Sequence, residues 1–222
     1  MSSSLHVFPT ARLNLFRHDG CRKMSVDRKK LMRYEKGHKE DVRQRILEVA
    51  SRLFRRDGVA ATGLAAIMHE SGLTIGAFYT HFNSKEQLVR DALVDSLTRG
   101  REALQTTFEL GLGPEAAIRD YLSPKHRDSP DEGCATSALV AEVGRHSPET
   151  RAAYAAELSA YIDLLADRLP GATREARSAN AISLYGLMVG TLQMARAVGN
   201  SPMSKKLLDS GIEAALALAN RQ

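Results

Sequence analysis

The sequence predicts an all-α protein with an N-terminal, three-helix helix-turn-helix domain and a larger C-terminal helical domain. Its 222 residues, 43% of them hydrophobic, are enough to bury a sizeable core. Apolar residues recur at helical spacing, while the alternation typical of strands is scarce. Abundant Ala, Leu, Arg and Glu also favour helices. We expect a disordered basic extension at 1–37, the helix-turn-helix domain at 38–98 and the larger domain at 99–222.

The first helix is expected from about His38 to Asp57, and Gly58 should end it. Its apolar residues repeat at the spacing of one buried face. The arginines of this segment fall on the other faces, where most should be solvated and one or two are candidates for phosphate contact. The apolar set is Val42, Ile46, Val49, Ala50, Leu53 and Phe54.

Residues 62–86 predict two short helices joined by a glycine turn. Thr62 is a candidate N-cap for the first, whose buried face would carry Leu64, Ile67 and Met68. Gly72 can take the left-handed conformation that ends a helix abruptly. This pattern is a helix-turn-helix motif, here running from Thr62 to His81.

The second helix of the motif is very short, and Thr74 is well suited to cap it. Ile75 and Phe78 are expected on its core side. Its other side chains carry hydroxyl, imidazole and methyl groups suited to a DNA groove and its phosphates. These are Thr74, Ala77, Tyr79, Thr80 and His81.

The motif resembles that of the TetR (tetracycline-repressor-like) family of bacterial transcriptional regulators, over about Lys39 to Asp95. Met68 and Ile75 depart from the family pattern, at positions where packing or base contact would change. The residues that match it are Thr62, Ile67, Gly72, Leu73, Thr74, Gly76, Phe78, Tyr79, His81, Phe82, Ser84, Lys85, Glu86 and Leu88.

The resemblance implies a dimeric, ligand-released repressor that binds a near-palindromic double-stranded DNA operator. The residues expected to contact phosphates are Thr62, Tyr79, His81 and Lys85. For Tyr79 the alternative is a buried aromatic side chain of the core. Despite the core position expected for Ile75, it is included among the residues expected to face the bases. These are Thr74, Ile75, Ala77 and Thr80.

Charge supports DNA binding by the N-terminal half. Residues 1–99 hold 18 Lys+Arg and 11 Asp+Glu, a balance of +7, while residues 100–222 hold 13 and 15, a balance of −2. Excess positive charge beside such a motif suits phosphate neutralisation.

The first 23 residues precede Met24, where we expect translation to begin; the alternative is a disordered basic arm that binds DNA phosphates. Residues 25–37 are expected to touch DNA or to be a solvated tail.

The rest of the chain predicts further helices separated by clear breaks. A long helix capped by Ser84 should run to about Leu110, and another should begin at Pro114 and run to about Leu122. Residues 123–133 predict a surface loop or a short helix. Four more helices are expected at 134–145, 148–169, 173–198 and 201–220.

The larger half is expected to hold an unknown small-molecule inducer and to form the dimer. Each candidate pocket residue has plain core packing as its alternative. The dimer is expected through the helices from Pro148 and Thr173, which carry rows of small residues such as Ala152, Ala156, Gly186 and Gly190. Pocket candidates are Leu139, Val143, Tyr154, Tyr161, Tyr185, Met188, Leu192 and Met194.

Cys134 lies at an expected helix start, where a thiol is more easily ionised, so a redox or electrophile sensor is the second function considered. The alternative is tight packing, and Asp131 and Glu132 would disfavour a thiolate. No disulfide with Cys21 is expected. His69 and His81 lack partners at metal-ligand spacing, so no metal or cofactor is expected.

The remaining function classes are disfavoured. The sequence has no motif of a hydrolase, phosphate-binding loop or metalloprotease, so an enzyme is the remote alternative. We see no signal peptide and expect a cytoplasmic protein. The uncharged run at 178–195 contains polar and small residues, which make it a poor membrane span and a better interface helix.

Overall fold

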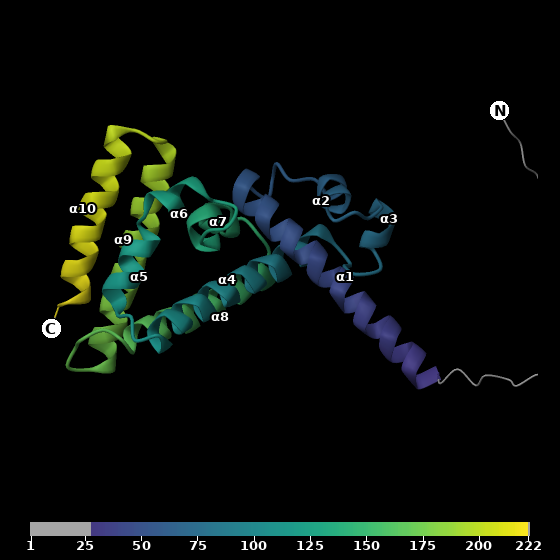
Figure 1. The fold of residues 1–222 in the computed structure, drawn as a ribbon, viewed down its shortest axis with the longest axis horizontal. Coiled ribbons are helices and arrows are strands. Elements are labelled where there is room, and N and C mark those ends of the chain that lie inside the picture. Colours follow the sequence, from purple (N-terminus) through teal and green to yellow (C-terminus); the bar gives the residue numbers. More distant parts are fainter. Residues whose placement is uncertain (1–27, 222) are drawn as a thin grey trace, which may run out of the picture. The chain divides into compact units, whose positions relative to one another are not determined.

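The computed structural model describes residues 28–221, and side chains from 37 onward. The expectations for the Met24 start, the N-terminal arm and Cys21 lie outside these residues. Within them the chain is all-α, as predicted, and none of its helices has the length and apolar character needed to cross a membrane. Its helices (Figure 1) are α1 (Arg28–Asp57), α2 (Leu64–Glu70), α3 (Ile75–Phe78), α4 (Lys85–Glu109), α5 (Pro114–Tyr121), α6 (Pro124–Asp128), α7 (Ala135–Val143), α8 (Pro148–Ala166), α9 (Arg174–Ala197) and α10 (Pro202–Ala219).

Most helix boundaries follow the predicted signals. Gly58 ends α1 with φ of 85° and Gly72 follows α2 with φ of 71°, both in the left-handed region. The Ser84 Oγ accepts from the Gln87 N–H at 3.1 Å, which fixes the start of α4. One boundary differs: α1 begins at Arg28, ten residues before the predicted start, so the disorder expected up to residue 37 was wrong for residues 28–37. Residues 28–36 are mostly good helix formers.

The N-cap predicted at Thr62 was wrong. Gly63 takes the N-cap position of α2 and offers no side chain. Thr62 is only 4% exposed, and its hydroxyl donates to the Gly58 carbonyl at 2.7 Å. Thr74 does occupy the N-cap position of α3, but its side chain makes no capping hydrogen bond.

One hydrophobic core joins α1, α2, α3, α4 and α7. Phe78 and Phe82 stack with ring centroids 5.6 Å apart and are fully buried with Ile67. Leu139 and Val143 of α7 pack in the same core. The helix-turn-helix is therefore built on an interior that includes a helix from much later in the chain.

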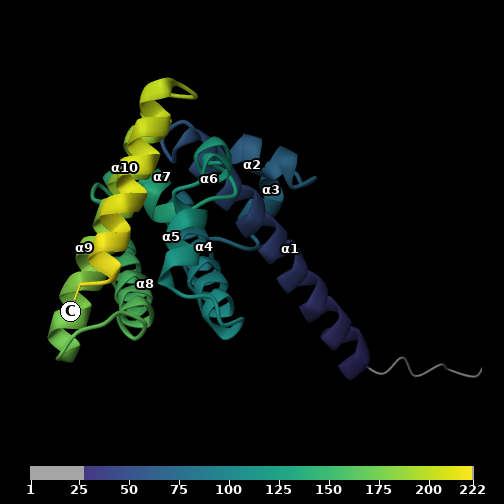
Figure 2. The same ribbon diagram turned by 60° about the vertical axis from the view of Figure 1, so that its left-hand side comes forward.

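A second core lies among α4, α5, α8, α9 and α10. In Figures 1 and 2, α10 lies along α9, and α8 runs beside α4. Leu184 and Leu192 of α9 are fully buried at its centre, against Ile118 and Leu122 from the region of α5.

Two carboxylates tie the helix-turn-helix region to helices from later in the chain. Glu142, at the end of α7, accepts from the Val59 and Ala60 N–H groups at 3.0 and 3.2 Å. Glu86, in the first turn of α4, accepts from the Ser147 N–H at 3.1 Å and from the Thr150 hydroxyl at 2.7 Å. Since charge-assisted hydrogen bonds are stronger than neutral ones, these contacts hold the helix-turn-helix on α7 and α8.

Candidate DNA-binding surface and ligand cavity

The short helix α3 displays its polar edge to solvent. Tyr79 is 67% exposed, which rules out its alternative role as a core aromatic. Thr74 and Thr80 are exposed, and Ala77 is half-buried. Ile75 is 53% exposed, so the core position predicted for it was wrong, whereas its position is open to a DNA base.

Phe78 fixes the orientation of this edge. It is 0% exposed, and the Tyr79 ring rests against it edge-on at a centroid distance of 5.1 Å. The Thr80 hydroxyl donates to the Ala77 carbonyl at 2.7 Å, which closes the last turn. A helix of four residues has little stability alone, so this buried aromatic anchor is what positions its exposed side chains.

The expected phosphate contacts occupy different environments. Lys85 donates from Nζ to the Val59 carbonyl at 2.8 Å and keeps further N–H donors. Burial, with Lys39 and Arg43 nearby, lowers the pKa of His81, whose Nδ1 has no hydrogen-bond partner among the described residues. Thr62 does not fit a phosphate contact, because its buried hydroxyl is already bonded to the Gly58 carbonyl.

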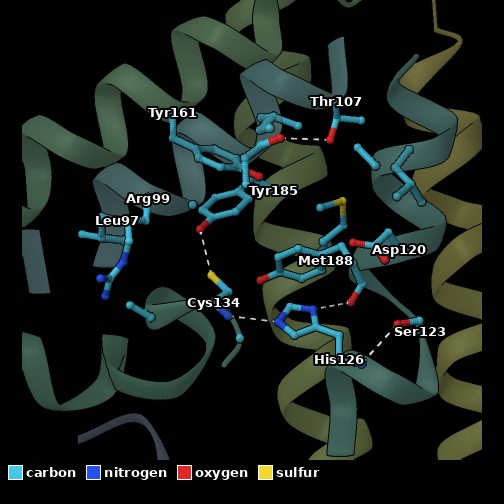
Figure 3. Close-up of a pocket in the computed structure, with 18 of the residues that line it drawn as sticks. Leu97, Arg99, Thr107, Asp120, Ser123, His126, Cys134, Tyr161, Tyr185 and Met188 are labelled. Carbon is cyan, nitrogen blue, oxygen red and sulfur yellow. Dashed lines mark hydrogen bonds between the residues drawn. The ribbon is translucent and has the colours of Figure 1, made fainter. Parts of the chain in front are cut away.

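A cavity of about 510 Å³ lies in the larger half (Figure 3). It is bounded by α4, α5, α8, α9, the end of α1 and the segment from α6 to the start of α7. This volume is within the usual range for small-molecule sites. Its apolar wall includes Leu104, Ile118, Leu165, Leu184 and Met188.

Three tyrosines form an aromatic wall of this cavity. Tyr161 and Tyr185 lie with ring centroids 4.6 Å apart, and Tyr121 is 6.3 Å from Tyr185. Burial raises the pKa of all three phenols, so each keeps its O–H at neutral pH. The Tyr121 hydroxyl is buried without a hydrogen-bond partner among the described residues.

His126 and Cys134 form one corner of the cavity (Figure 3). His126 Nε2 accepts from the Cys134 N–H at 3.0 Å, which places the ring proton on Nδ1, 2.7 Å from the Tyr121 carbonyl. Burial lowers the pKa of His126, so the ring is neutral. The Cys134 Sγ lies 3.3 Å from the Tyr185 hydroxyl. This corner therefore presents a thiol beside a neutral imidazole whose two nitrogens are already hydrogen-bonded.

The structure separates the expected pocket residues into two groups. Tyr161, Tyr185 and Met188 line the cavity. The expectation does not hold for the others, which meet protein or solvent instead. Leu139, Val143 and Tyr154 pack in or against the core of the helix-turn-helix, Leu192 is buried in the second core, and Met194 is exposed.

Sequence reasoning missed the charged and imidazole groups of the cavity. Arg55 and Arg99 both line it, although helical periodicity placed Arg55 on a face expected to be mostly solvated. His126 lies in a segment expected to be surface loop or short helix. Of these three residues, only His126 could have been found from the sequence. It lies in a proline-containing segment with the signals of a capped short helix, and such a segment is ordered. Among the described side chains, no three His, Cys, Asp or Glu residues come together as a metal site would require.

Comparisons with known proteins agree with this geometry. Residues 46–92 match the family model described as bacterial regulatory proteins, tetR family. ArpR of Pseudomonas putida, a probable HTH-type transcriptional regulator, is 42% identical over 94 residues, which are 41% of this chain and 44% of that protein. TtgR, an HTH-type transcriptional regulator that also comes from Pseudomonas putida, is 42% identical over 79 residues, 36% of this chain and 37% of that protein. Each match thus spans less than half of the relative.

A solved structure shares the fold over most of the chain. Reduced NemR from E. coli superposes with a TM-score of 0.66 at 22% identity, over 79% of this chain and 95% of that chain. The fold likeness extends well beyond the segment matched by the family model. This chain therefore carries, at residues 46–92, the helix-turn-helix region of the tetR family of bacterial regulatory proteins.

Proposed function

We propose that the protein is a dimeric transcriptional repressor that binds a near-palindromic operator and is released from it by a small molecule. In this proposal residues 38–98 bind DNA, and residues 99–222 bind the ligand and form the dimer. The observation that carries it is the exposed edge of α3, with Thr74, Ile75 and Thr80 open to bases and Tyr79 open to a phosphate.

The electrostatics support this assignment. The N-terminal half has a balance of +7, and Lys85 lies at the first turn of α4, where backbone N–H groups and helix dipole also favour a phosphate. His81 contributes as a neutral donor or acceptor, since its pKa is lowered. The proposed phosphate contacts are thus Tyr79, His81 and Lys85.

The proposal is tested by binding of fluorescent duplexes from the gene's own chromosomal neighbourhood, in low salt. We expect a marked preference for one near-palindromic fragment over scrambled DNA. Tyr79→Phe and Lys85→Ala should weaken binding to every sequence, and Lys85→Ala should reduce the salt slope by about one ion. Arg119→Ala, an exposed charge on α5 outside the proposed DNA and dimer surfaces, is the control that should leave the slope unchanged. Equal affinity for all duplexes would reject sequence-specific regulation.

We propose that the dimer forms through α8 and α9, the helices from Pro148 and Thr173, with α10 beside them. Large apolar side chains are exposed on the last two, Ile182 and Met194 on α9 and Met203 on α10. The α8 helix exposes small residues such as Ala152 and Ala156 and lies beside α4. Since interface centres favour large apolar anchors, we take α9 and α10 as the anchors of this surface.

Sedimentation of full-length variants tests this surface. Ile182→Lys should shift the protein from dimer to monomer, because a charge would be buried in the interface. Leu110→Lys is the matched control, since Leu110 is also exposed but lies at the end of α4. A dimer that survives Ile182→Lys and Met203→Lys together would contradict this placement.

Release of DNA would follow from a change in α4. Leu97, Leu104 and Thr107 of this helix line the cavity, and its first turn carries Glu86 and Lys85. A ligand that displaces the cavity half of α4 would tilt the helix and change the separation of the two α3 helices. The population would then shift to a conformer that fits adjacent major grooves poorly.

A thiol-based sensor is the second candidate, and the position of Cys134 in the cavity wall favours it. The thiol is half-buried, beside the Tyr185 hydroxyl. Peroxide treatment of the wild type and of Cys134→Ser, followed by operator binding, separates the two candidates. Loss of operator binding in the oxidised wild type alone would favour the sensor; equal behaviour of both proteins would favour the ligand-released repressor.

A further inference from the structure

Arg55 is a cavity-lining cation without a close counter-ion. Its guanidinium donates to the Asp131 carbonyl, from Nε at 2.8 Å and from a second nitrogen, and to the hydroxyls of Ser51 and Ser96. All these partners are uncharged. Among residues 37–221, no carboxylate oxygen comes within the 4.0 Å ion-pair distance of this group. A partly buried charge without a counter-ion costs free energy, which a bound anion would offset.

Arg99 adds a second positive charge to the same wall. Burial, and then the nearby Arg99, lower the pKa of Arg55 to about 10, and the more distant carboxylates of Asp131 and Asp95 offset only part of this. Asp95 is itself bonded to Arg99 at 2.8 Å and accepts from Gln44 at 3.2 Å. The carboxylate that pairs with Arg99 is therefore already engaged, and Arg55 has no carboxylate of its own at ion-pair distance among residues 37–221.

The acidic side chains that line the cavity do not fill this need. In Figure 3, Arg99 lies on the side of Tyr161 and Tyr185, whereas Asp120 lies on the opposite side. Glu132 also lines the cavity but forms no ion pair with Arg55 or Arg99 among the described residues. Arg99 thus lies on the same side of the cavity as Tyr161 and Tyr185, and the Cys134 thiol next to Tyr185 also lies close enough to Arg55 to affect its pKa.

The aromatic wall specifies the rest of the ligand. Tyr161 and Tyr185 present flat surfaces suited to stacking, and the Tyr121 O–H is a buried donor without an acceptor among the described residues. A ligand acceptor would satisfy this O–H, which otherwise costs free energy. The volume of about 510 Å³ accommodates more than one ring.

We propose that the cavity binds an aromatic carboxylic acid, with the carboxylate between Arg55 and Arg99 and the rings against Tyr121, Tyr161 and Tyr185. The inference rests on the proposed function, in which this cavity is the ligand site. The proposal also couples ligand binding to the DNA-binding region, because Arg55 belongs to α1 of the helix-turn-helix region. A carboxylate competes with the Asp131 carbonyl for the Arg55 donors, and so changes how α1 is held on the segment before α7.

Calorimetric titration of the full-length protein tests the ligand class with three probes, benzoate, 2-naphthoate and 4-biphenylcarboxylate. Each is compared with its neutral primary amide, which has the same rings and nearly the same shape. We expect at least one acid to bind, and its amide to bind about 10-fold or more weakly, because a charge-assisted bidentate contact is lost. Equal affinity of acid and amide, or no binding of any acid at about 1 mM, would overturn the proposal.

Variants identify the site. Arg55→Gln and Arg99→Gln should each lower the affinity for the acid about 10-fold or more and leave the weaker affinity for the amide unchanged. Arg119→Gln is the control: Arg119 lies on cavity-lining α5 but pairs with Glu115 at 2.9 Å outside the cavity wall. If Arg55→Gln does not fold by circular dichroism, Arg99→Gln carries the test. An acid that binds both variants as tightly as the wild type would refute this placement.

Operator binding in the presence of the same acids keeps the two proposals apart. Acid binding without operator release would leave the ligand class standing and reject ligand release by this class. Operator release by a neutral or cationic compound that binds both arginine variants equally would support ligand release and reject the acid. A protein that binds acids but no operator would contradict the proposed regulator alone.

Discussion

The core of the helix-turn-helix and the core of the larger half differ in how their polar side chains are arranged. The first is closed and apolar: Ile67, Phe78 and Phe82 are fully buried, and the polar groups of α3 point outward. The second surrounds a cavity into which arginine, histidine, tyrosine and cysteine side chains are turned. One interior supports an exposed surface, and the other is itself the surface that a ligand would meet.

This difference has consequences for rigidity. A closed apolar core loses both transfer free energy and packing when a side chain is shortened, so it holds α3 in one position. The walls of a cavity have fewer partners on one side, and polar groups there can exchange hydrogen bonds with a ligand. We therefore expect substitutions to act differently in the two interiors.

The largest effect should come from the closed core. Phe78→Ala should lower the free energy of unfolding by about 3–5 kcal/mol and abolish DNA binding, because it empties the anchor of α3. Urea denaturation followed by circular dichroism measures this. Tyr79→Ala, at the exposed neighbouring position, should cost only about 1 kcal/mol, the size of its edge-on contact with Phe78. A comparable loss in both variants would show that α3 is not anchored through Phe78.

A smaller effect is expected at the hydrogen bonds between the first turn of α4 and the start of α8. Burial alone would raise the pKa of Glu86, but hydrogen bonds from Thr150, His146 and Ser147 outweigh it and hold the pKa at about 2. The stability from this group is present above its ordinary pKa of 4.5 and is lost as pH falls from there toward 2.

Glu86→Ala should therefore cost about 1 kcal/mol near neutral pH, a value reduced for solvent screening because the side chain is 39% exposed. The difference from the wild type should shrink as pH falls through that window. Unfolding free energies measured at several pH values check this, with exposed Glu102→Ala on α4 as the control. A difference that does not depend on pH would contradict the carboxylate's role.

The smallest effect should have the opposite sign. Tyr121→Phe removes a buried O–H that has no partner among the described residues, and should raise stability by about 0.5 kcal/mol. Tyr185→Phe is the matched variant, since it removes an O–H that contacts the Cys134 Sγ and should not stabilise. Thermal unfolding of both proteins without ligand distinguishes them. Destabilisation by Tyr121→Phe would indicate that its hydroxyl has a partner, such as an ordered water.

Local sequence signals predicted the helices well, because caps, glycines and apolar periodicity act over a few residues. Ser84, Gly58 and Gly72 end or begin helices as expected. Thr62 and Ile75 were misassigned, since a cap and a threonine bonded to a carbonyl look alike in sequence, and a four-residue helix has too few positions to define a face.

The cavity was much less predictable, because its walls come from segments far apart in the chain. Tyr161, Tyr185 and Met188 were found as members of an apolar list, but Leu139 and Val143 share the same pattern and pack in the other core. Arg55 has the spacing of a surface residue on α1. Only the fold brings it to Ser96 and Asp131, so no local pattern could have assigned it.

The turn after α1 limits which sequences this fold can accept. At Gly58, φ is 85°, and an added Cβ would lie 2.8 Å from a Glu142 side-chain oxygen that belongs to a residue over eighty positions later. The Glu142 carboxylate meanwhile binds the two amides that follow this glycine. A sliding movement of α7 must therefore carry this turn along or break both hydrogen bonds. The turn and the Glu142 carboxylate thus couple the position of α7 to that of α1.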